Sequence, residues 1–222
     1  MPRILHHNAD EISPMKRSSI VIVALIALIG GFGLSWYAHN SKPIELESGL
    51  WFGEQARALP EFELIDHNRQ ALTRDTMRGQ WSLLFFGFTH CPDICPISLQ
   101  TLADMLEAID DVDVSDAIRI YFVSVDPQRD SPEVLAEYVK YFHPDFSGAT
   151  AALDQLTPLT RSLGIAHTIR NRTDASPDYD VDHSAAIVLI NPQAEYAGLF
   201  SAPHDPLAMA RDMTRIVERH PL

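Results

Sequence analysis

The chain has 222 residues with 17 basic and 30 acidic side chains, which gives a formal net charge of −13 at pH 7. A protein with this charge is repelled by nucleic acid and by anionic lipid headgroups, so the composition excludes nucleic-acid binding as its function. The length corresponds to one domain plus an appendage, and with only two cysteines the chain is not a disulfide-dense scaffold.

The first predicted element is an apolar segment close to the N-terminus. Residues 20–37 contain no charged side chain, and a helix of that length, at about 1.5 Å per residue, reaches about 27 Å, close to the hydrocarbon thickness of a bilayer. Lys16 and Arg17 precede it, so the positive-inside rule predicts a cytoplasmic tail over 1–17 and a transmembrane anchor over 18–37.

A cleaved signal peptide is the alternative interpretation of this segment. No Ala-x-Ala cleavage site follows, and the apolar run is longer than a typical signal core. We therefore expect an uncleaved, single-pass protein of the bacterial inner membrane, with its C-terminal part in the periplasm.

The rest of the chain is predicted to be a tether and lead-in over 38–59, followed by one domain over 60–222. Apolar runs and alternating patterns predict strands, and apolar residues at helical spacing predict helices. The predicted strands are 62–65, 72–77, 81–88, 118–125, 165–170, 185–190 and 196–200; the predicted helices start at Pro96 and Pro132 and cover 153–163 and 206–219. Strands that alternate with helices and end in a hairpin indicate an α/β domain with a mixed sheet.

The two cysteines, Cys91 and Cys95, lie where an apolar strand runs into a turn bracketed by Pro92 and Pro96. Residues at i and i+4 on a helical turn share one face, with Cβ atoms about 5–6 Å apart. Two thiolates at this spacing can share one soft metal ion, and a small closure allows a disulfide. A purely structural disulfide that closes so short a loop stabilises little. Metal binding and redox exchange are therefore the two chemistries left open.

His183 lies where a polar loop enters the predicted strand 185–190. Sites in α/β proteins lie in loops at sheet ends, so a strand next to the cysteine strand brings this imidazole to both sulfurs. Two thiolates and one imidazole select Cu(I) and can hold Cu(II), with zinc an alternative if a fourth ligand is added. Asp93 and Asp182 are expected to cap the helix or to orient His183. His90 reaches the same ion only through an awkward turn.

Three segments of the chain resemble the Sco/SenC proteins. They are FTHCPDICP at 88–96, VSVDPQRDSPE at 123–133 and VDHS at 181–184. The resemblance extends over about residues 50–220, in the same order and spacing. The turn at 66–70 lacks the glycine common in that family, and the loop at 171–180 differs locally.

The resemblance implies a thioredoxin-like fold, a mixed sheet flanked by helices, on one N-terminal transmembrane helix. It implies one copper ion per domain, bound by Cys91, Cys95 and His183. The implied function is assembly of the binuclear copper centre of cytochrome c oxidase, by copper delivery, by reduction of the target cysteines, or both. The implied partners are the copper-binding oxidase subunit and other copper chaperones or thiol-disulfide reductases.

Other classes of thioredoxin-like protein fit the chain less well. A general disulfide reductase uses Cys-x-x-Cys, whereas three residues separate Cys91 from Cys95, and His183 stands where such proteins carry a cis-proline. A peroxiredoxin places threonine three residues before its cysteine, but Thr89 is only two before Cys91. A copper or redox sensor remains an alternative to a metallochaperone. A Cys91–Cys95 disulfide removes both thiolates, so copper capture requires the reduced pair.

Overall fold

The computed structural model describes residues 17–40, 44–170 and 179–222. The chain divides into two compact units, Met1–Pro43 and Ile44–Leu222. In the first unit, helix α1 (Arg17–Asn40) has 24 residues, and the predicted tail lies, up to residue 16, outside the described residues. Among the residues that the structure describes, no helix has both the length and the hydropathy that a membrane crossing requires. The transmembrane prediction is therefore not confirmed.

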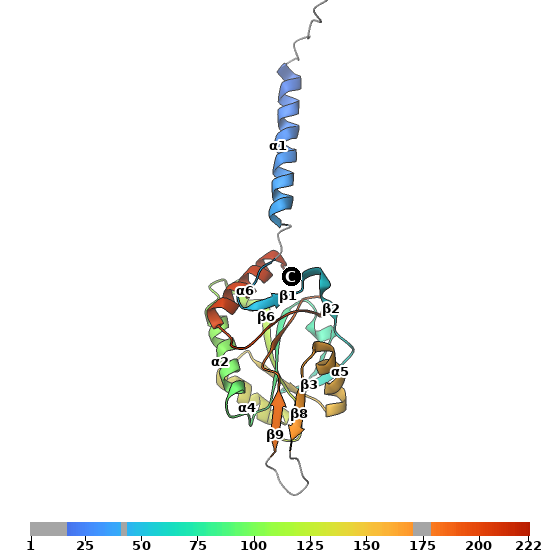
Figure 1. The fold of residues 1–222 in the computed structure, drawn as a ribbon, viewed down its shortest axis with the longest axis vertical. Coiled ribbons are helices and arrows are strands. Elements are labelled where there is room, and N and C mark those ends of the chain that lie inside the picture. Colours follow the sequence, from blue (N-terminus) through green and yellow to red (C-terminus); the bar gives the residue numbers. More distant parts are fainter. Residues whose placement is uncertain (1–16, 41–43, 171–178) are drawn as a thin grey trace, which may run out of the picture. The chain divides into compact units, whose positions relative to one another are not determined.

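The second unit is built on a mixed sheet, as predicted (Figure 1). In the described residues its strand order is β1-β11-β10-β5-β6-β7-β3-β4, and β2 pairs with β11. The pairs β5–β6 and β6–β7 are parallel and the others are antiparallel. The strands are β1 (Gly49–Trp51), β2 (Arg57–Ala58), β3 (Glu63–Asp66), β4 (Ala71–Thr73), β5 (Trp81–Gly87), β6 (Ile118–Ser124), β7 (Ser147–Thr150), β10 (Ile187–Ile190) and β11 (Glu195–Phe200).

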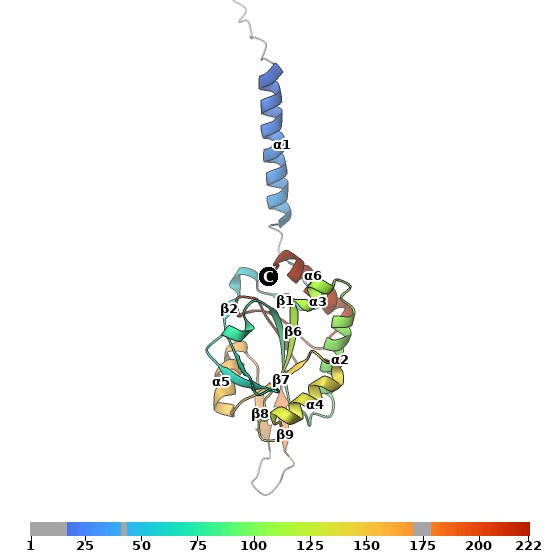
Figure 2. The same cartoon turned by 180° about the vertical axis from the view of Figure 1, so that it is seen from behind.

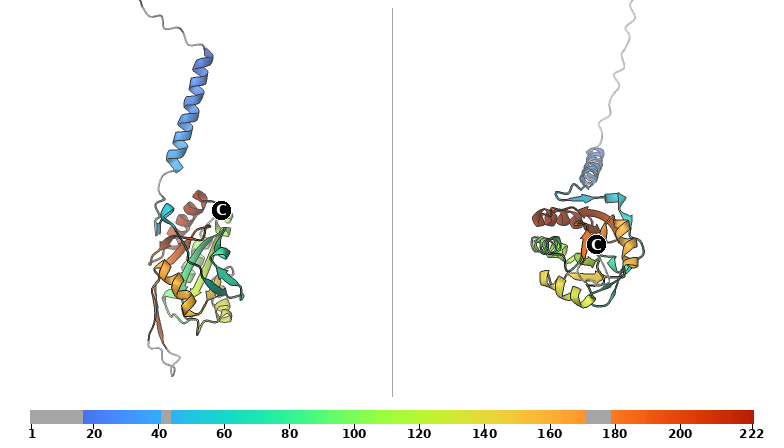
Figure 3. Two further views of the ribbon diagram at one scale, coloured as in Figure 1. Left: turned by 90° about the vertical axis from the view of Figure 1, so that its right-hand side faces the viewer. Right: turned by 60° about the horizontal axis from the view of Figure 1, so that its bottom comes forward.

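Helices cover both faces of this sheet (Figures 2 and 3). Side chains alternate along a strand, so Leu83 and Phe85 of β5 face one helical layer, whereas Leu84 and Phe86 face the other. The first layer contains α2 (Ile94–Glu107), α3 (Val112–Asp116), α4 (Pro132–Phe142) and α6 (Pro206–Arg219), and the second contains α5 (Leu153–Leu163). Short 3₁₀ turns, η1 (Gly53–Gln55) and η2 (Asp75–Met77), complete the unit.

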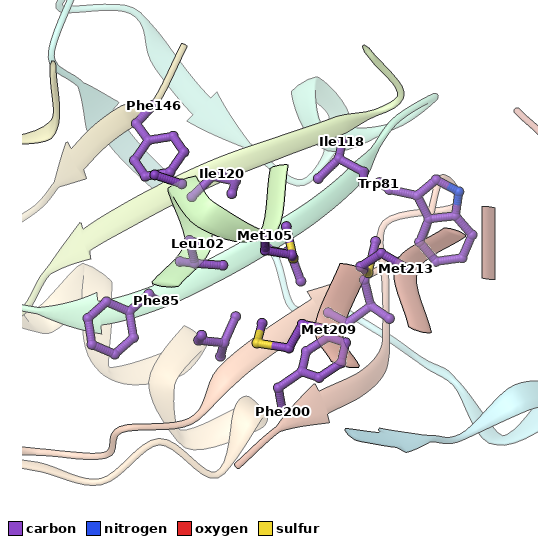
Figure 4. Close-up of a cluster of buried hydrophobic side chains, with 14 of the residues drawn as sticks. Trp81, Phe85, Leu102, Met105, Ile118, Ile120, Phe146, Phe200, Met209 and Met213 are labelled. Carbon is purple, nitrogen blue, oxygen red and sulfur yellow. The ribbon is translucent and has the colours of Figure 1, made fainter. Parts of the chain in front are cut away.

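The larger core cluster lies between the sheet and the first helical layer. Figure 4 shows Trp81, Phe85, Leu102, Met105 and Phe200 gathered there, and each is at most 1 % exposed. Burial of one such side chain contributes about 1.5–3 kcal/mol. Cys95 belongs to the same cluster. One of the three predicted metal ligands is therefore anchored in the core.

Short sequence signals predicted most helix and strand boundaries correctly. Ser131 caps α4 by accepting a hydrogen bond from the Val134 backbone N–H, and Gly164 ends α5 in the left-handed conformation with φ 70°. Helix α2 begins at Ile94, earlier than the predicted start at Pro96. Strands β1 and β2 lie within the range predicted as tether and lead-in, and they pair with β11. The compact unit accordingly starts at Ile44.

A separate two-stranded sheet is formed by β8 (His167–Arg170) and β9 (Asp180–His183). Its strands are antiparallel, with His167 opposite His183. In Figures 1 and 2 this hairpin lies at the end of the domain away from the C-terminus. Residues 180–182 were predicted to belong to a polar loop that leads to His183, but they form strand β9 instead, and His183 is its last residue. The remaining part of that predicted loop, 171–178, lies outside the described residues.

Candidate metal centre

The two cysteines are held by the junction between β5 and α2. Strand β5 is buried along its whole length and ends at Gly87. The chain then turns, with the Cys91 backbone N–H donating to the Phe88 carbonyl at 3.2 Å, and α2 begins at Ile94. As a result Cys91 is partly exposed at the turn, whereas Cys95 is fully buried in the first turn of the helix. Both cysteines are free thiols.

Gly87 shapes the pocket of the buried sulfur. A Cβ atom at this position would lie 2.5 Å from Cys95 Sγ and 2.8 Å from Phe122 Cε2. Both distances are shorter than a van der Waals contact, so any other residue here displaces the sulfur or the strand. Sequence reasoning missed this residue. The available signal was a glycine at the end of a buried strand, directly before the cysteine motif.

His183 points its ring into the same junction. Its Nε2 lies 3.2 Å from Cys95 Sγ, and its Nδ1 lies 3.1 Å from the Ser184 carbonyl oxygen. Because a carbonyl oxygen only accepts, Nδ1 carries the proton and Nε2 keeps a lone pair directed at the sulfur. The rings of Phe85 and Phe88 stand edge-on to the imidazole, with centroids at 6.0 and 5.7 Å. The histidine is therefore oriented as a nitrogen ligand.

The structure brings together the three residues predicted to bind metal. One ligand atom each from Cys91, Cys95 and His183 lies within 4.8 Å of the other two. Strand β10 makes this possible because it pairs directly with the cysteine strand β5, as predicted. In the described part of the chain, no further His, Cys, Asp or Glu joins this group.

The neighbouring polar residues have other roles. His90 Nδ1 lies 3.0 Å from the Thr89 hydroxyl and is not part of the ligand group. Asp93 occupies the N-cap position of α2, but its side chain makes no capping hydrogen bond, so the expectation that it caps the helix was wrong. Asp182 forms an ion pair with Arg170 across the hairpin. Its charge raises the pKa of His183, but that effect is smaller than the effect of burial.

Burial determines the protonation of the site. Desolvation, together with the neighbouring Cys91, raises the pKa of the Cys95 thiol far above its ordinary range. Desolvation lowers the pKa of His183, so its imidazole is neutral at pH 7. A metal ion must therefore displace a proton from Cys95, whereas His183 is ready to bind through Nε2. Two sulfurs and one imidazole form a soft, low-coordinate set that fits copper.

Fold and site together define a thioredoxin-like α/β protein with a soft-metal centre at a strand-to-helix junction. A family model described as SCO1/SenC matches residues 53–218. The chain belongs to the SCO1/SenC family, which confirms the resemblance drawn from the three sequence motifs.

Individual relatives and solved structures support the same family membership. The chain is 33 % identical to "Protein SCO2 homolog, mitochondrial" of Bos taurus, over 93 % of this chain and 76 % of that protein. It is 33 % identical to a "Putative copper-binding protein" of Stutzerimonas stutzeri, over 91 % of this chain and 95 % of that protein. The crystal structure of Arabidopsis thaliana ScoI with copper bound superimposes with a TM-score of 0.66 at 32 % identity, covering 73 % of this chain and 99 % of that chain.

Proposed function

We propose that this protein binds one copper ion through Cys91, Cys95 and His183. The observation that carries the proposal is the convergence of two sulfurs and one imidazole nitrogen within 4.8 Å of one another. The copper-bound Arabidopsis relative supports the choice of metal. Ligand softness supports it independently, because thiolates select Cu(I) and the imidazole makes the set suitable for Cu(II) as well. A structural zinc site uses four protein ligands, and the described residues supply three.

The three residues contribute differently to binding. Cys95 offers a thiolate after loss of its proton, and burial makes its affinity for copper depend on pH. Cys91 offers the more accessible sulfur at the turn. His183 offers a neutral nitrogen whose orientation is set by the Ser184 carbonyl. Two thiolates can hold Cu(I) without further help, so His183 matters most for Cu(II).

We further propose that the bound copper is cargo for the binuclear copper centre of cytochrome c oxidase. The copper-binding oxidase subunit is the proposed recipient, and another copper chaperone or a thiol-disulfide reductase is the proposed donor or reductant. Family membership supports this function. Membrane attachment through residues 18–37 and a periplasmic location are proposals that rest on the apolar run behind Lys16 and Arg17.

Reduction of the target cysteines is a second candidate function. The contrast between the partly exposed Cys91 and the buried Cys95 favours it, because a thiol exchange needs one accessible attacking sulfur and one resolving sulfur. In this reaction Cys91 attacks a disulfide of the recipient and forms a mixed disulfide. Cys95 then attacks Cys91 Sγ, which releases the recipient as a dithiol and leaves a Cys91–Cys95 disulfide.

Copper titration of the full-length protein in mild detergent tests the binding proposal. The reduced protein is expected to bind one Cu(I), and the protein with a Cys91–Cys95 disulfide is expected to bind almost none, because its thiolates are consumed. His183→Ala is expected to weaken Cu(II) binding far more than Cu(I) binding. Equal binding by reduced and oxidised protein, or equal losses for both copper states in His183→Ala, would refute the assigned ligands.

A transfer experiment separates the two candidate functions. The copper-loaded protein is mixed with the reduced apo copper-binding domain of an oxidase subunit, and the reduced, copper-free protein is mixed with the disulfide form of that domain; copper and free thiols are then measured on both proteins. Copper delivery predicts movement of the metal without thiol oxidation on the chaperone. Thiol reduction predicts a new Cys91–Cys95 disulfide and two new thiols on the recipient. If neither occurs, the oxidase function is wrong while copper binding stands.

A further inference from the structure

The histidine of the proposed copper site lies on the β8–β9 hairpin, which is separate from the main sheet. His183 ends β9, and β9 pairs with β8 alone among the described strands. The two cysteines, in contrast, follow a strand in the middle of the main sheet. The distance between imidazole and sulfurs therefore depends on the short link from His183 to β10, which pairs with β5, and on the contacts that hold the hairpin against the rest of the domain.

A three-residue cluster attaches the start of β9, at the opposite end of that strand from His183, to the loop that follows β6. Asp126 is fully buried and forms an ion pair with Arg129, and the Tyr179 hydroxyl donates to Asp126 Oδ1 at 2.5 Å. The Arg129 guanidinium lies 3.8 Å from the centre of the Tyr179 ring, and its Nη1 donates to the Tyr179 carbonyl at 3.3 Å. We call Asp126, Arg129 and Tyr179 the Arg129 latch.

The same loop also holds the cysteine turn. Asp130 is fully buried and accepts hydrogen bonds from the Thr89 backbone N–H at 3.0 Å and the Thr89 hydroxyl at 2.6 Å. It accepts a third from the Ser124 hydroxyl at 2.6 Å. Thr89 precedes Cys91 by two residues. Loop 126–130 therefore contacts both halves of the proposed copper site.

The Phe88 ring connects the latch to His183. The Arg129 guanidinium lies 5.4 Å from the centre of the Phe88 ring, and the Phe88 ring stands edge-on to His183 at 5.7 Å. Phe88 thus lies between the cation and the imidazole. Movement of the guanidinium would be transmitted through this ring to the histidine.

Burial distinguishes the latch from an ordinary surface ion pair. The Arg129 side chain is 18 % exposed and that of Asp126 is 0 % exposed, whereas exposed ion pairs contribute little. Loss of the arginine leaves the Asp126 carboxylate buried without its countercharge, which is strongly unfavourable. The Tyr179 hydroxyl would then donate to a carboxylate without a countercharge, and the hairpin would lose this polar attachment, although Val181 would still pack in the core.

We propose that the Arg129 latch is a positioning unit that holds the histidine hairpin against the cysteines and so sets the affinity for Cu(II). This inference rests on the proposed copper function. Cu(II) requires the imidazole and depends on the latch, whereas Cu(I) binds to the two thiolates without it. The simpler alternative is that Arg129 braces only its own turn, in which case the hairpin does not respond to its loss.

Copper affinities of latch variants of the full-length protein test this proposal. Arg129→Met removes the ion pair and the stacking, and it is expected to weaken Cu(II) binding by about 10–100-fold, the range found for residues that support a metal ligand. Cu(I) affinity is expected to stay unchanged. Tyr179→Phe keeps the ring and removes the hydroxyl, so a smaller loss is expected, and Arg129→Lys restores part of the affinity that methionine loses. The matched control is Arg69→Met, which removes an exposed ion pair with Glu133 and should change neither affinity.

Two further measurements separate positioning from general damage. Amide hydrogen exchange of the metal-free protein is expected to become faster in β8 and β9 of Arg129→Met and to stay unchanged in β5 and β10. In a His183→Ala background, Arg129→Met is expected to cause no further loss of Cu(II) affinity.

The latch is refuted by unchanged exchange in the hairpin, by equal loss of Cu(I) and Cu(II), or by a full Arg129→Met effect in the His183→Ala background. If the wild-type protein binds no copper, the proposed function fails. Hydrogen exchange of the metal-free protein then still decides whether Arg129 holds the hairpin.

Discussion

Replacement of Gly87 by alanine is the sharpest test of how the buried sulfur is placed. The new methyl group would lie 2.5 Å from Cys95 Sγ, against an ordinary separation of about 3.5–4.0 Å, so the sulfur or the strand must move by roughly 1 Å. The sulfur is enclosed, because Cys95 is 0 % exposed and His183 Nε2 lies 3.2 Å away. Overpacking of this kind costs about 1–3 kcal/mol, which corresponds to a fall in Tm of about 2–12 °C for a unit of this size.

Thermal unfolding of the reduced protein by circular dichroism, followed by copper titration, measures both effects. Copper affinity is expected to fall by about 10–100-fold, as for other residues that support a metal ligand. The matched control is Gly148→Ala, whose methyl group would lie 2.8 Å from Leu135 Cβ and contact no cysteine. It should lower Tm by a similar amount and leave copper affinity unchanged. An unchanged Tm and copper affinity in Gly87→Ala, or an equal loss of copper affinity in Gly148→Ala, would refute the reasoning.

Two further predictions concern stability. Burial raises the pKa of the Cys95 thiol, so the folded protein keeps a proton that the unfolded chain releases above about pH 8.5. The free energy of unfolding of the reduced protein should therefore fall above that pH by up to about 1.4 kcal/mol per unit; a urea titration series that gives the same slope for Cys95→Ala would contradict this. Asp212 is fully buried and accepts from the Glu47 and Ser48 backbone N–H groups, each at 2.8 Å. Asp212→Ala should destabilise the protein by about 1.5–3 kcal/mol, the contribution of a hydrogen bond to a charged group, and speed proteolysis near residue 47, with copper affinity unchanged. Equal proteolysis of variant and wild type would show that this carboxylate does not hold the segment.

The predictions that the structure confirmed rest on patterns within short stretches of chain. The continuous apolar run at 81–88 predicted a strand buried on both faces, and β5 is buried at every position. Ser131 and Gly164 predicted helix ends because cap chemistry depends on a few neighbouring residues. Strand β7 was not predicted, because Ser-Gly-Ala-Thr carries no apolar pattern and becomes a strand only through pairing with β6 and β3.

The proposed copper ligands were predicted from residue type and order, but the contacts that hold them in place were not predicted. In the structure Arg129 reaches Tyr179, 50 residues later, and Asp130 reaches Thr89, 41 residues earlier. No periodicity in the sequence encodes such contacts, because they depend on where two distant loops meet.

By itself, the sequence determined which chemistry this protein can carry: two thiols and one imidazole, an α/β domain to hold them, and an acidic surface. Only the tertiary structure decided how that chemistry is assembled. It placed Cys95 in the core and packed its sulfur against Gly87. It also brought His183 to the sulfurs on a hairpin separate from the main sheet. The physical reason is that residue types set donor softness and local conformation, whereas distances across 88 residues of chain are set by packing.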